Sequence, residues 1–325
     1  MYATVPAQAP SLRGRHLLDV ASLTAAGLTS ILTVAQYLKA HSGAPALPLL
    51  RGKTLVLLFE KPSLRTRVSF EVAMHQLGGQ TLFANGGEFA IGTRETPEDA
   101  GRVLSRYADA IVVRTHADEP LHRFANASSV PVINGLSAGA HPCQALADLL
   151  TLQERFGTLR DLRIAFLGDA KNNVAASLAE AAVMAGATVH FGCPPTHRPS
   201  EPFLAHLQQL GEESGGAARA FSSPIRAVRG VDAIYTDVWT SMGEEALKER
   251  NSAVLSPYRV DANLFKYAAP HAVFMHCLPA HRGEEVTAEV IDGPQSAVFD
   301  QAENRMHAQK AVLLALLTDL RGIPS

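Results

Sequence analysis

The chain has 325 residues, a length that predicts two domains of roughly 150 residues each. Its net charge of −2 and its 18% of charged residues exclude a strongly basic surface for nucleic acid or a polybasic membrane anchor. No apolar run approaches the length of a membrane span, and the N-terminal stretch Met1–Pro10 lacks the pattern of a signal peptide. We therefore expect a cytoplasmic protein with a small partner, no nucleic acid and no membrane.

The three cysteines, Cys143, Cys193 and Cys277, are odd in number and far apart in the sequence. No two of them have the spacing of metal ligands, so the sequence indicates neither a disulfide framework nor a zinc site. Free cysteines are typical of the reducing cytoplasm. We expect no metal ion and no cofactor.

Short apolar runs alternate with helical patterns along the chain. The first helical pattern lies within His16–Ala40, where polar residues interrupt an apolar stretch. Strands are predicted at Thr54–Phe59, Gln80–Phe83, Ala110–Val113, Pro131–Asn134, Leu162–Leu167, Thr188–Phe191, Ala233–Thr236 and Ala272–His276. Helices are predicted at Arg67–Leu77, Pro97–Tyr107, Cys143–Phe156, Val174–Ala185, Glu201–Leu210, Glu244–Asn251 and about Glu303–Leu320.

This alternation predicts an α/β protein with two doubly wound domains, each a mostly parallel sheet with helices on both faces. We place the boundary near Gln153–Asp161, so that residues 1–152 form one domain and residues 153–302 the other. A C-terminal helix at about residues 303–325 is expected to pack back on the first domain. The polar, glycine-rich segment Gly211–Ala220 predicts a surface loop. Ligands of open α/β sheets bind beyond the carboxyl ends of the strands, so polar residues that follow strands are candidates for a site.

The first such cluster follows the strand Thr54–Phe59. Pro62 ends the extended segment, Ser63 can cap a helix, and Leu64-Arg65-Thr66 form its opening turn. Free N–H groups and the helix dipole favour an anion there, and Arg65 adds a guanidinium suited to bidentate phosphate binding. Taken alone, the pattern is equally compatible with an ordinary capped helix that carries surface arginines.

Three further clusters follow strands or open helices. They are Arg114-Thr115-His116, His141-Pro142-Cys143-Gln144 and His276-Cys277-Leu278-Pro279. A single Arg or His after a strand usually only caps or is solvated, but several donor clusters at strand ends are hard to explain in that way. They supply cations and N–H donors, with too few carboxylates for a metal site.

These motifs resemble those of a known family, the aspartate/ornithine carbamoyltransferases. Phe59–Arg67 resembles the family's carbamoyl-phosphate loop, and His141-Pro142-Cys143-Gln144 resembles its second signature. Asp237–Gly243 and His276–Pro279 are similar to the ornithine-specific members, and Glu303-Asn304-Arg305 continues the resemblance, which covers about Ser11 to Leu320. The resemblance implies transfer of a carbamoyl group from carbamoyl phosphate to the δ-amine of L-ornithine, giving L-citrulline and phosphate, in arginine metabolism.

The resemblance also implies a role for each matching residue. The carbamoyl-phosphate ligands would be Ser63, Leu64 through its backbone N–H, Arg65, Thr66, Arg114, His141, Gln144, Cys277, Leu278 through its carbonyl, and Arg305. The ornithine ligands would be Asn173, Asp237, Ser241, Met242 and Cys277. The catalytic residues would be Arg114, His141, Asp237, Cys277 and Arg305. The proton of the amine would pass to the departing phosphate or to Asp237, and the family implies a homotrimer or a higher assembly of trimers.

Two positions depart from the family pattern. Leu64 stands where Thr is frequent, which keeps the backbone N–H and loses a hydroxyl. Ala90 stands where members often carry a polar side chain that reaches a neighbouring subunit's phosphate. Either Arg94 substitutes for that side chain or the contact between subunits is weaker here.

Two other classes of protein compete with this interpretation. A dinucleotide-binding oxidoreductase would need a Gly-x-Gly-x-x-Gly turn, and the turn Gly168–Asn173 lacks the second and third glycines. A non-catalytic relative is the other alternative, and intact Arg114, His141 and Arg305 argue against it. Within the family, Asp237 would repel an acidic acceptor such as aspartate, and the Ser241-Met242-Gly243 loop favours ornithine over putrescine.

Overall fold

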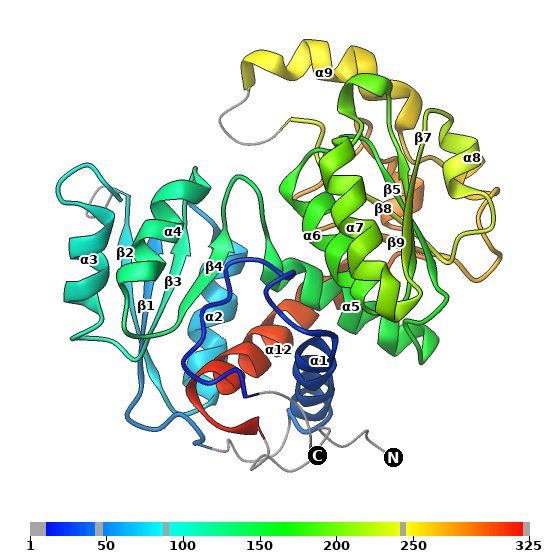
Figure 1. Ribbon diagram of the computed structural model, residues 1–325. Helices are drawn as coiled ribbons and strands as arrows, with labels where there is room; N and C mark the ends of the chain where they lie inside the picture. Colours follow the sequence, from blue (N-terminus) through cyan, green and yellow to red (C-terminus); the bar gives the residue numbers. More distant parts are fainter. Residues whose placement is uncertain (1–10, 43–47, 87–90, 241–244, 321–325) are drawn as a thin grey trace. The chain divides into compact units, whose positions relative to one another are not determined.

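Figure 1 shows the computed structural model of the chain, which describes residues 11–42, 48–86, 91–240 and 245–320. Spatial proximity of the Cα atoms divides the chain into two compact units. Unit 1 comprises Met1–Leu150 and Asn304–Ser325, and unit 2 comprises Thr151–Glu303. The boundaries predicted near residues 152 and 303 lie close to these limits. Each unit contains a parallel sheet flanked by helices, which confirms the predicted fold class.

The sheet of unit 1 has the strand order β2-β1-β3-β4, and each neighbouring pair is parallel. Its strands are β1 (Thr54–Phe59), β2 (Gln80–Asn85), β3 (Ala110–Arg114) and β4 (Val132–Leu136). The central strands β1 and β3 are almost wholly buried apolar runs, as expected of a parallel sheet covered on both faces. The order of the strands reverses between β1 and β3, so the carboxyl ends of these two strands flank a topological switch point.

The helices that belong wholly to unit 1 are α1 (Ala25–Ala40), α2 (Leu64–Gln76), α3 (Pro97–Leu104) and α4 (Asp118–Ala127). Two further helices, α5 (Pro142–Phe156) and α12 (Val298–Leu317), continue across the limit between the units. Helices α3 and α4 pack on one face of the sheet, where Ala100 and Phe124 join Val56 and Ile111 in a buried apolar core.

The sheet of unit 2 has the order β7-β6-β5-β8-β9, again with parallel neighbours. Its strands are β5 (Arg163–Leu167), β6 (Thr188–Gly192), β7 (Ala217–Phe221), β8 (Ala233–Thr236) and β9 (Val273–Met275). The order reverses between β5 and β8, which creates the switch point of unit 2. Its helices are α6 (Asn173–Met184), α7 (Glu201–Ser214), α8 (Pro224–Val228), α9 (Lys248–Leu255), α10 (Ala262–Phe265) and α11 (Ala288–Ile291). Helices α8, α10 and α11 contribute Val228, Leu264 and Ile291 to one core with Ile234 and Phe274 of the sheet.

The prediction of a surface loop at Gly211–Ala220 is wrong. Helix α7 continues to Ser214, Gly215 ends it with a left-handed backbone at φ 82°, and β7 begins at Ala217. The glycines serve close packing, since a Cβ atom on Gly216 would lie 2.2 Å from the carbonyl oxygen of Val183. A composition that is typical of a loop therefore encodes a tight turn from a helix into an edge strand.

The start of the first helix also differs from the prediction within His16–Ala40. Helix α1 begins only at Ala25, where the Thr24 hydroxyl accepts the N–H of Gly27. Leu17 instead pairs its backbone with Val132 and Asn134, beside β4. Helix α4 was not predicted because Ala117 at its N-cap offers no capping side chain. The predicted strands all correspond to strands of the structure, with ends that differ slightly.

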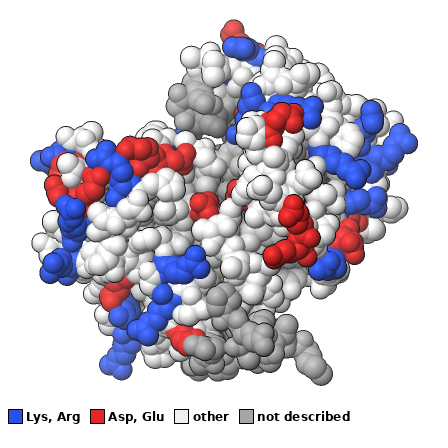
Figure 2. Space-filling view, viewed as in Figure 1, with Lys and Arg blue, Asp and Glu red and all other residues white. Residues whose placement is uncertain are grey.

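The surface of the described residues is mixed in charge. Figure 2 shows acidic and basic side chains interspersed over one face. Exposed apolar side chains gather on α2 and on the edge strand β2, where Leu64 is 77%, Val68 45% and Leu82 60% exposed. Among the helices in the described ranges, none is long and apolar enough to cross a membrane.

Candidate active site

Ser63 opens α2 just beyond the carboxyl end of β1, at the switch point of unit 1. Its backbone is extended, and its Oγ accepts the Thr66 N–H at 3.2 Å, so the predicted cap is confirmed. The Ser63 hydroxyl also donates to Thr66 Oγ1 at 3.0 Å. The first turn of a helix leaves N–H groups without partners inside the helix, and Leu64 lies in that turn with its side chain exposed.

Arg65 and Arg67 lie on the same helix but differ in their contacts with other side chains. Arg67 donates to Glu71 Oε1 at 2.9 Å, and its guanidinium carbon lies 3.8 Å from the centroid of the Phe83 ring. No hydrogen bond or ion pair joins the half-buried Arg65 side chain to another described residue. Arg65 therefore has its hydrogen-bond donors available for an anion, whereas Arg67 is committed to the protein.

A chain of buried hydrogen bonds continues from Thr66 to three residues that lie far along the sequence. Arg305 on α12 donates from Nη2 to Thr66 Oγ1 at 2.5 Å and from Nη1 to Gln144 Oε1 at 3.1 Å. Gln144 in turn donates from Nε2 to Asp148 Oδ1 at 2.8 Å. Because the carboxylate takes the NH2 end of the amide, the oxygen end of Gln144 must face Arg305. Asp148 was missed by sequence reasoning, although its place one helical turn after Gln144 was visible.

Arg114 and His141 complete the group in unit 1. Arg114 ends β3, on the other side of the switch point from Ser63, and it is only 5% exposed. His141 directly precedes α5 and is only 4% exposed. Burial lowers the pKa of His141 well below its ordinary value, and the charges of Arg305 and Arg114 lower it further. His141 is therefore a neutral imidazole near two guanidinium groups.

Glu60, the residue after β1, is a second feature that sequence reasoning did not single out. Its Oε1 accepts the Ile91 N–H at 2.7 Å, and its Oε2 accepts a short hydrogen bond from the Thr115 hydroxyl. The carboxylate thus ties the end of β3 and the start of the 91–96 segment to the end of β1. Ala90 lies outside the described residues, and Arg94, four positions later in the sequence, is exposed.

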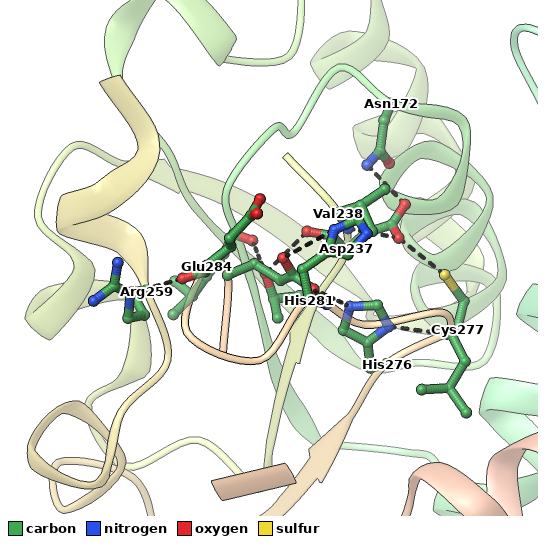
Figure 3. A network of polar contacts seen from close by, with 12 residues as sticks. Asn172, Asp237, Val238, Arg259, His276, Cys277, His281 and Glu284 are labelled. Atoms are coloured by element: carbon green, nitrogen blue, oxygen red, sulfur yellow. Dashed lines mark hydrogen bonds and ion pairs between the residues drawn. The ribbon is translucent and has the colours of Figure 1, made fainter. Parts of the chain in front are cut away.

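The switch point of unit 2 carries Asp237, which follows β8. As Figure 3 shows, Asp237 is the centre of a polar network. Its Oδ1 accepts the Val238 N–H at 2.8 Å and the Cys277 thiol at 3.0 Å. Its Oδ2 accepts a bond from Asn172 Nδ2 at 3.2 Å, and Asn172 also caps α6 by accepting the Ala175 N–H.

The environment of Asp237 sets the chemistry of its neighbours. Burial raises the pKa of the Asp237 carboxyl, while the hydrogen bonds from the Cys277 thiol and the Val238 N–H oppose that rise. Cys277 acts as a hydrogen-bond donor to this carboxylate, so its sulfur carries a proton in this arrangement. A protonated thiol is a poor nucleophile, which agrees with a positioning role for Cys277.

The other ligands predicted in this part of the chain, for ornithine and, at Leu278, for carbamoyl phosphate, are placed less completely. Asn173 is the first residue of α6, next to the Asn172 that bonds to Asp237. Ser241 and Met242 lie outside the described residues. Leu278 has a left-handed backbone with φ 56°, is joined to Pro279 by a cis peptide bond, and donates its N–H to His276 Nδ1 at 2.9 Å.

Three donor atoms of Asp237, His276 and Cys277 lie within 4.8 Å of one another, close enough to suggest a metal site. Both ring nitrogens of His276 are engaged, however, because Nδ1 accepts from Leu278 and Nε2 lies 3.2 Å from Glu285 Oε1. A metal ion could take His276 only after one of these bonds had broken. We therefore assign this cluster to hydrogen bonding.

The structure thus brings the predicted residues into two groups. One group, in unit 1, joins Ser63, Thr66, Gln144 and Arg305 through hydrogen bonds and holds Arg114 and His141 nearby. The other, in unit 2, joins Asp237 to Cys277 and sets Leu278 beside them.

Comparison with known proteins also divides the chain into two domains. Residues 15–154 match the carbamoyl-P binding domain of aspartate/ornithine carbamoyltransferases, and residues 160–316 match their Asp/Orn binding domain. The chain belongs to the aspartate/ornithine carbamoyltransferase family. Its relatives include the ornithine carbamoyltransferase of Pyrococcus abyssi, which is 48% identical over 309 residues, 94% of this chain and 97% of the relative. The anabolic ornithine carbamoyltransferase of Pyrococcus furiosus is 47% identical over 313 residues, 96% of this chain and 99% of the relative.

Solved structures of carbamoyltransferases share the whole fold. The ornithine carbamoyltransferase from Pyrococcus furiosus superposes with a TM-score of 0.92 at 47% identity, covering 97% of this chain and 100% of the other. The enzyme from Thermus thermophilus gives a TM-score of 0.85 at 42% identity, with 95% and 100% covered. The likeness therefore extends over both units.

Proposed function

We propose that the chain catalyses the ornithine carbamoyltransferase reaction, in which carbamoyl phosphate and L-ornithine give L-citrulline and phosphate. The observation that carries this proposal is the bonding of Arg305 to Thr66 and Gln144 at the switch point of unit 1, beside the buried Arg114. Buried guanidinium groups beside an open helix N-terminus form a site for a strongly anionic ligand. Full-length relatives carry the name of this enzyme.

The phosphate end of carbamoyl phosphate is assigned to Ser63, Arg65, Thr66 and Arg114, with the N–H of Leu64. The free donors of Arg65 and the open first turn of α2 support this assignment. The exposed Leu64 side chain leaves only its backbone for this task. The missing hydroxyl at position 64 therefore places more of the binding on Ser63 and Thr66.

The carbamoyl end is assigned to His141, Gln144 and Arg305, and to the Leu278 carbonyl and Cys277. Negative charge develops on the carbonyl oxygen as the amine attacks, and Arg305 and the neutral His141 stabilise it by hydrogen bonds. A neutral imidazole can donate one hydrogen bond without repelling the neighbouring guanidinium groups. The bond from Arg305 to Gln144 presets the direction of the guanidinium before the substrate arrives.

The acceptor amino acid is assigned to Asn173, Asp237, Ser241, Met242 and Cys277. A carboxylate at position 237 attracts an ammonium or amine group and repels an acidic substrate. In the reaction a C–N bond forms, the C–O bond to phosphate breaks, and the amine loses one proton. That proton goes to the departing phosphate or to Asp237, whose raised pKa makes it a competent acceptor.

An assay of citrulline formation tests the proposed function. Purified protein is supplied with carbamoyl phosphate and, in parallel, with L-ornithine, putrescine or N-acetylornithine. We expect turnover with L-ornithine to exceed turnover with the other two amines, because the acceptor site would recognise both the α-amino and α-carboxylate groups. Tight binding of carbamoyl phosphate without turnover of any amine would instead identify a non-catalytic relative.

We further assign the chain to a homotrimer in the cytoplasm that serves arginine biosynthesis. The exposed apolar residues Leu64, Val68 and Leu82, on α2 and on the edge strand β2, support an interface between copies of the chain. The relative from Pyrococcus furiosus is named an anabolic enzyme, which supports the biosynthetic direction.

A further inference from the structure

A buried acid–imidazole pair lies behind the turn that carries Cys277 and Leu278. His276 and Glu285 are both 0% exposed, and His276 Nε2 lies 3.2 Å from Glu285 Oε1 (Figure 3 shows the His276 ring within the network). Neither side chain has a role in the reaction as assigned above. A fully buried carboxylate and imidazole are costly to keep, so the pair requires a reason.

The ring of His276 is held in a single tautomer by the backbone. Its Nδ1 accepts the Leu278 N–H at 2.9 Å, and an amide N–H can only donate. Nδ1 must therefore carry a lone pair, and the ring proton sits on Nε2. That proton faces Glu285 Oε1, which accepts it. A proton moved to Nδ1 would break the bond to Leu278.

The same oxygen of Glu285 also holds the backbone of the segment that follows Leu278. Glu285 Oε1 also accepts the His281 N–H at 2.6 Å, while Oε2 has no hydrogen-bond partner among the described residues. The Glu285 carbonyl accepts the Val260 N–H at 2.9 Å, which fixes residue 285 to the body of unit 2. One carboxylate oxygen thus joins the start and the end of the segment from His276 to Glu285.

The hydrogen bond to His276 holds Leu278 in an unusual backbone conformation. Its φ of 56° is in the left-handed region, which a leucine adopts only when its surroundings hold it there. The bond to His276 Nδ1 is the contact that holds its N–H. The adjacent Cys277 places its sulfur on Asp237 from the same turn.

We propose that Glu285 is a positioning residue: through His276 it holds the Leu278 carbonyl and Cys277 in the orientation in which they meet the carbamoyl group and the acceptor amine. This inference rests on the proposed function. Glu285 touches neither substrate in it. It acts by accepting the Nε2 proton of His276 and the His281 N–H, which fixes the ring and the path of the turn. A small displacement of groups at a reacting centre is enough to slow a reaction strongly.

Substitutions at position 285 separate this role from general stability. Glu285→Ala removes the acceptor, and we expect kcat for citrulline formation to fall about 100-fold. Glu285→Gln should stay within about fivefold of the wild type, because a single amide oxygen can accept both bonds that Oε1 accepts now. Glu285→Asp retains the charge but is shorter by one methylene, and it should lose activity despite its carboxylate.

Two further measurements complete the test, and the first separates a loss of positioning from a general loss of folded protein. The Kd for inorganic phosphate, measured by calorimetry, should be unchanged in all three variants, since the phosphate residues lie in unit 1. Nitrogen NMR of histidine-labelled wild-type protein should show His276 protonated at Nε2 only, with its signal identified by its loss in His276→Asn. Glu284→Ala is the matched control. Among the described residues the Glu284 side chain pairs only with Lys248, at 2.9 Å, so the kcat of this variant should equal that of the wild type.

Three results would overturn the inference. They are wild-type kcat in Glu285→Ala or in Glu285→Asp, an equal loss in Glu285→Gln and Glu285→Ala, and a His276 ring protonated at Nδ1. The NMR result can contradict the inference even where a variant does not fold, because it uses the wild-type protein and a ring protonated only at Nδ1 could not donate to Glu285. A wild-type protein that forms no citrulline would reject the proposed function. An active wild type with an equally active Glu285→Ala variant would reject only the role of Glu285.

Discussion

Arg305 and Thr66 lie 239 residues apart in the sequence, and the Arg305 guanidinium donates to the Thr66 hydroxyl over 2.5 Å. The bond connects the last helix of the chain to the first turn of α2. Ser63 caps α2 by accepting the Thr66 N–H, and its hydroxyl donates to the same Thr66 Oγ1, so the guanidinium is joined directly to the helix N-terminus proposed to bind the phosphate. The hydrogen-bonded group around Asp237 in unit 2 is the second part of the proposed site.

Arg65→Ala should weaken the binding of carbamoyl phosphate in the transition state by on the order of 3 kcal/mol or more. Its half-buried guanidinium has donors free for phosphate, whereas Arg67 is held by Glu71 and Phe83. Steady-state kinetics with carbamoyl phosphate varied would measure the loss in kcat/KM. Arg67→Ala is the control and should lose far less. An unchanged kcat/KM in Arg65→Ala would remove Arg65 from the phosphate site.

Arg305→Lys should lower kcat about 100-fold although the charge is retained. A lysine ammonium cannot bond to Thr66 and Gln144 in the way that the forked guanidinium does. Single-turnover kinetics with saturating substrates would separate this chemical step from product release. The exposed Arg102 on α3 supplies the control, and Arg102→Lys should behave as the wild type does. Equal rates in Arg305→Lys and Arg102→Lys would show that the two hydrogen bonds of the Arg305 guanidinium have no part in catalysis.

The value of kcat/KM for ornithine should rise with pH between about pH 6 and 9, below the ordinary amine pKa near 10.4. Only the neutral amine is a nucleophile, and its fraction grows with pH throughout that window. Initial rates at subsaturating ornithine in buffers of constant ionic strength would measure the slope. A flat profile over this range would contradict attack by a minor neutral form.

Asp237→Asn should abolish most of the activity while raising the stability of the folded chain at neutral pH. Burial raises the pKa of Asp237 in the folded state, so ionisation of this carboxyl costs stability, and the cost is fully present above that raised pKa. The Tm of Asp237→Asn should therefore exceed that of the wild type at about pH 8, and the difference should shrink as the pH falls toward the unfolded pKa of about 3.9. Calorimetry across this range would measure it. Asp99→Asn, at an exposed site in the first turn of α3, should show no gain.

Leu82→Asp should shift the proposed trimer toward single chains. Leu82 is 60% exposed on the edge strand β2, and a charge placed in a buried interface is costly. Light scattering coupled to size-exclusion chromatography would measure the mass. Tyr267→Ser, at an exposed apolar residue of unit 2, is the control. A wild-type protein that elutes with the mass of one chain would contradict the assembly itself.

Much of the fold was predictable because its signals are local. Buried strands such as β1 and β3 are continuous apolar runs, and the Ser63 cap depends on residues within one turn of it. Sequence patterns gave a wrong prediction where the same local composition is compatible with more than one structure. Gly215 and Gly216 suggested a loop, yet Gly215 provides the left-handed backbone that ends α7, and Gly216 lets the chain pass close to the Val183 carbonyl before β7.

The sequence by itself determined which residue types are available at the ends of the strands, and through its motifs it determined the family. The tertiary structure decided how they combine. Arg305 meets Thr66 and Gln144 only because α12 packs in unit 1, and Asn172 bonds to Asp237 only because β5 and β8 are neighbours. The pairing of His276 with Glu285, nine residues along the chain, depends on the path of the turn between them and on its burial. Hydrogen bonds between distant segments depend on chain topology and burial, and periodicity along the chain carries neither.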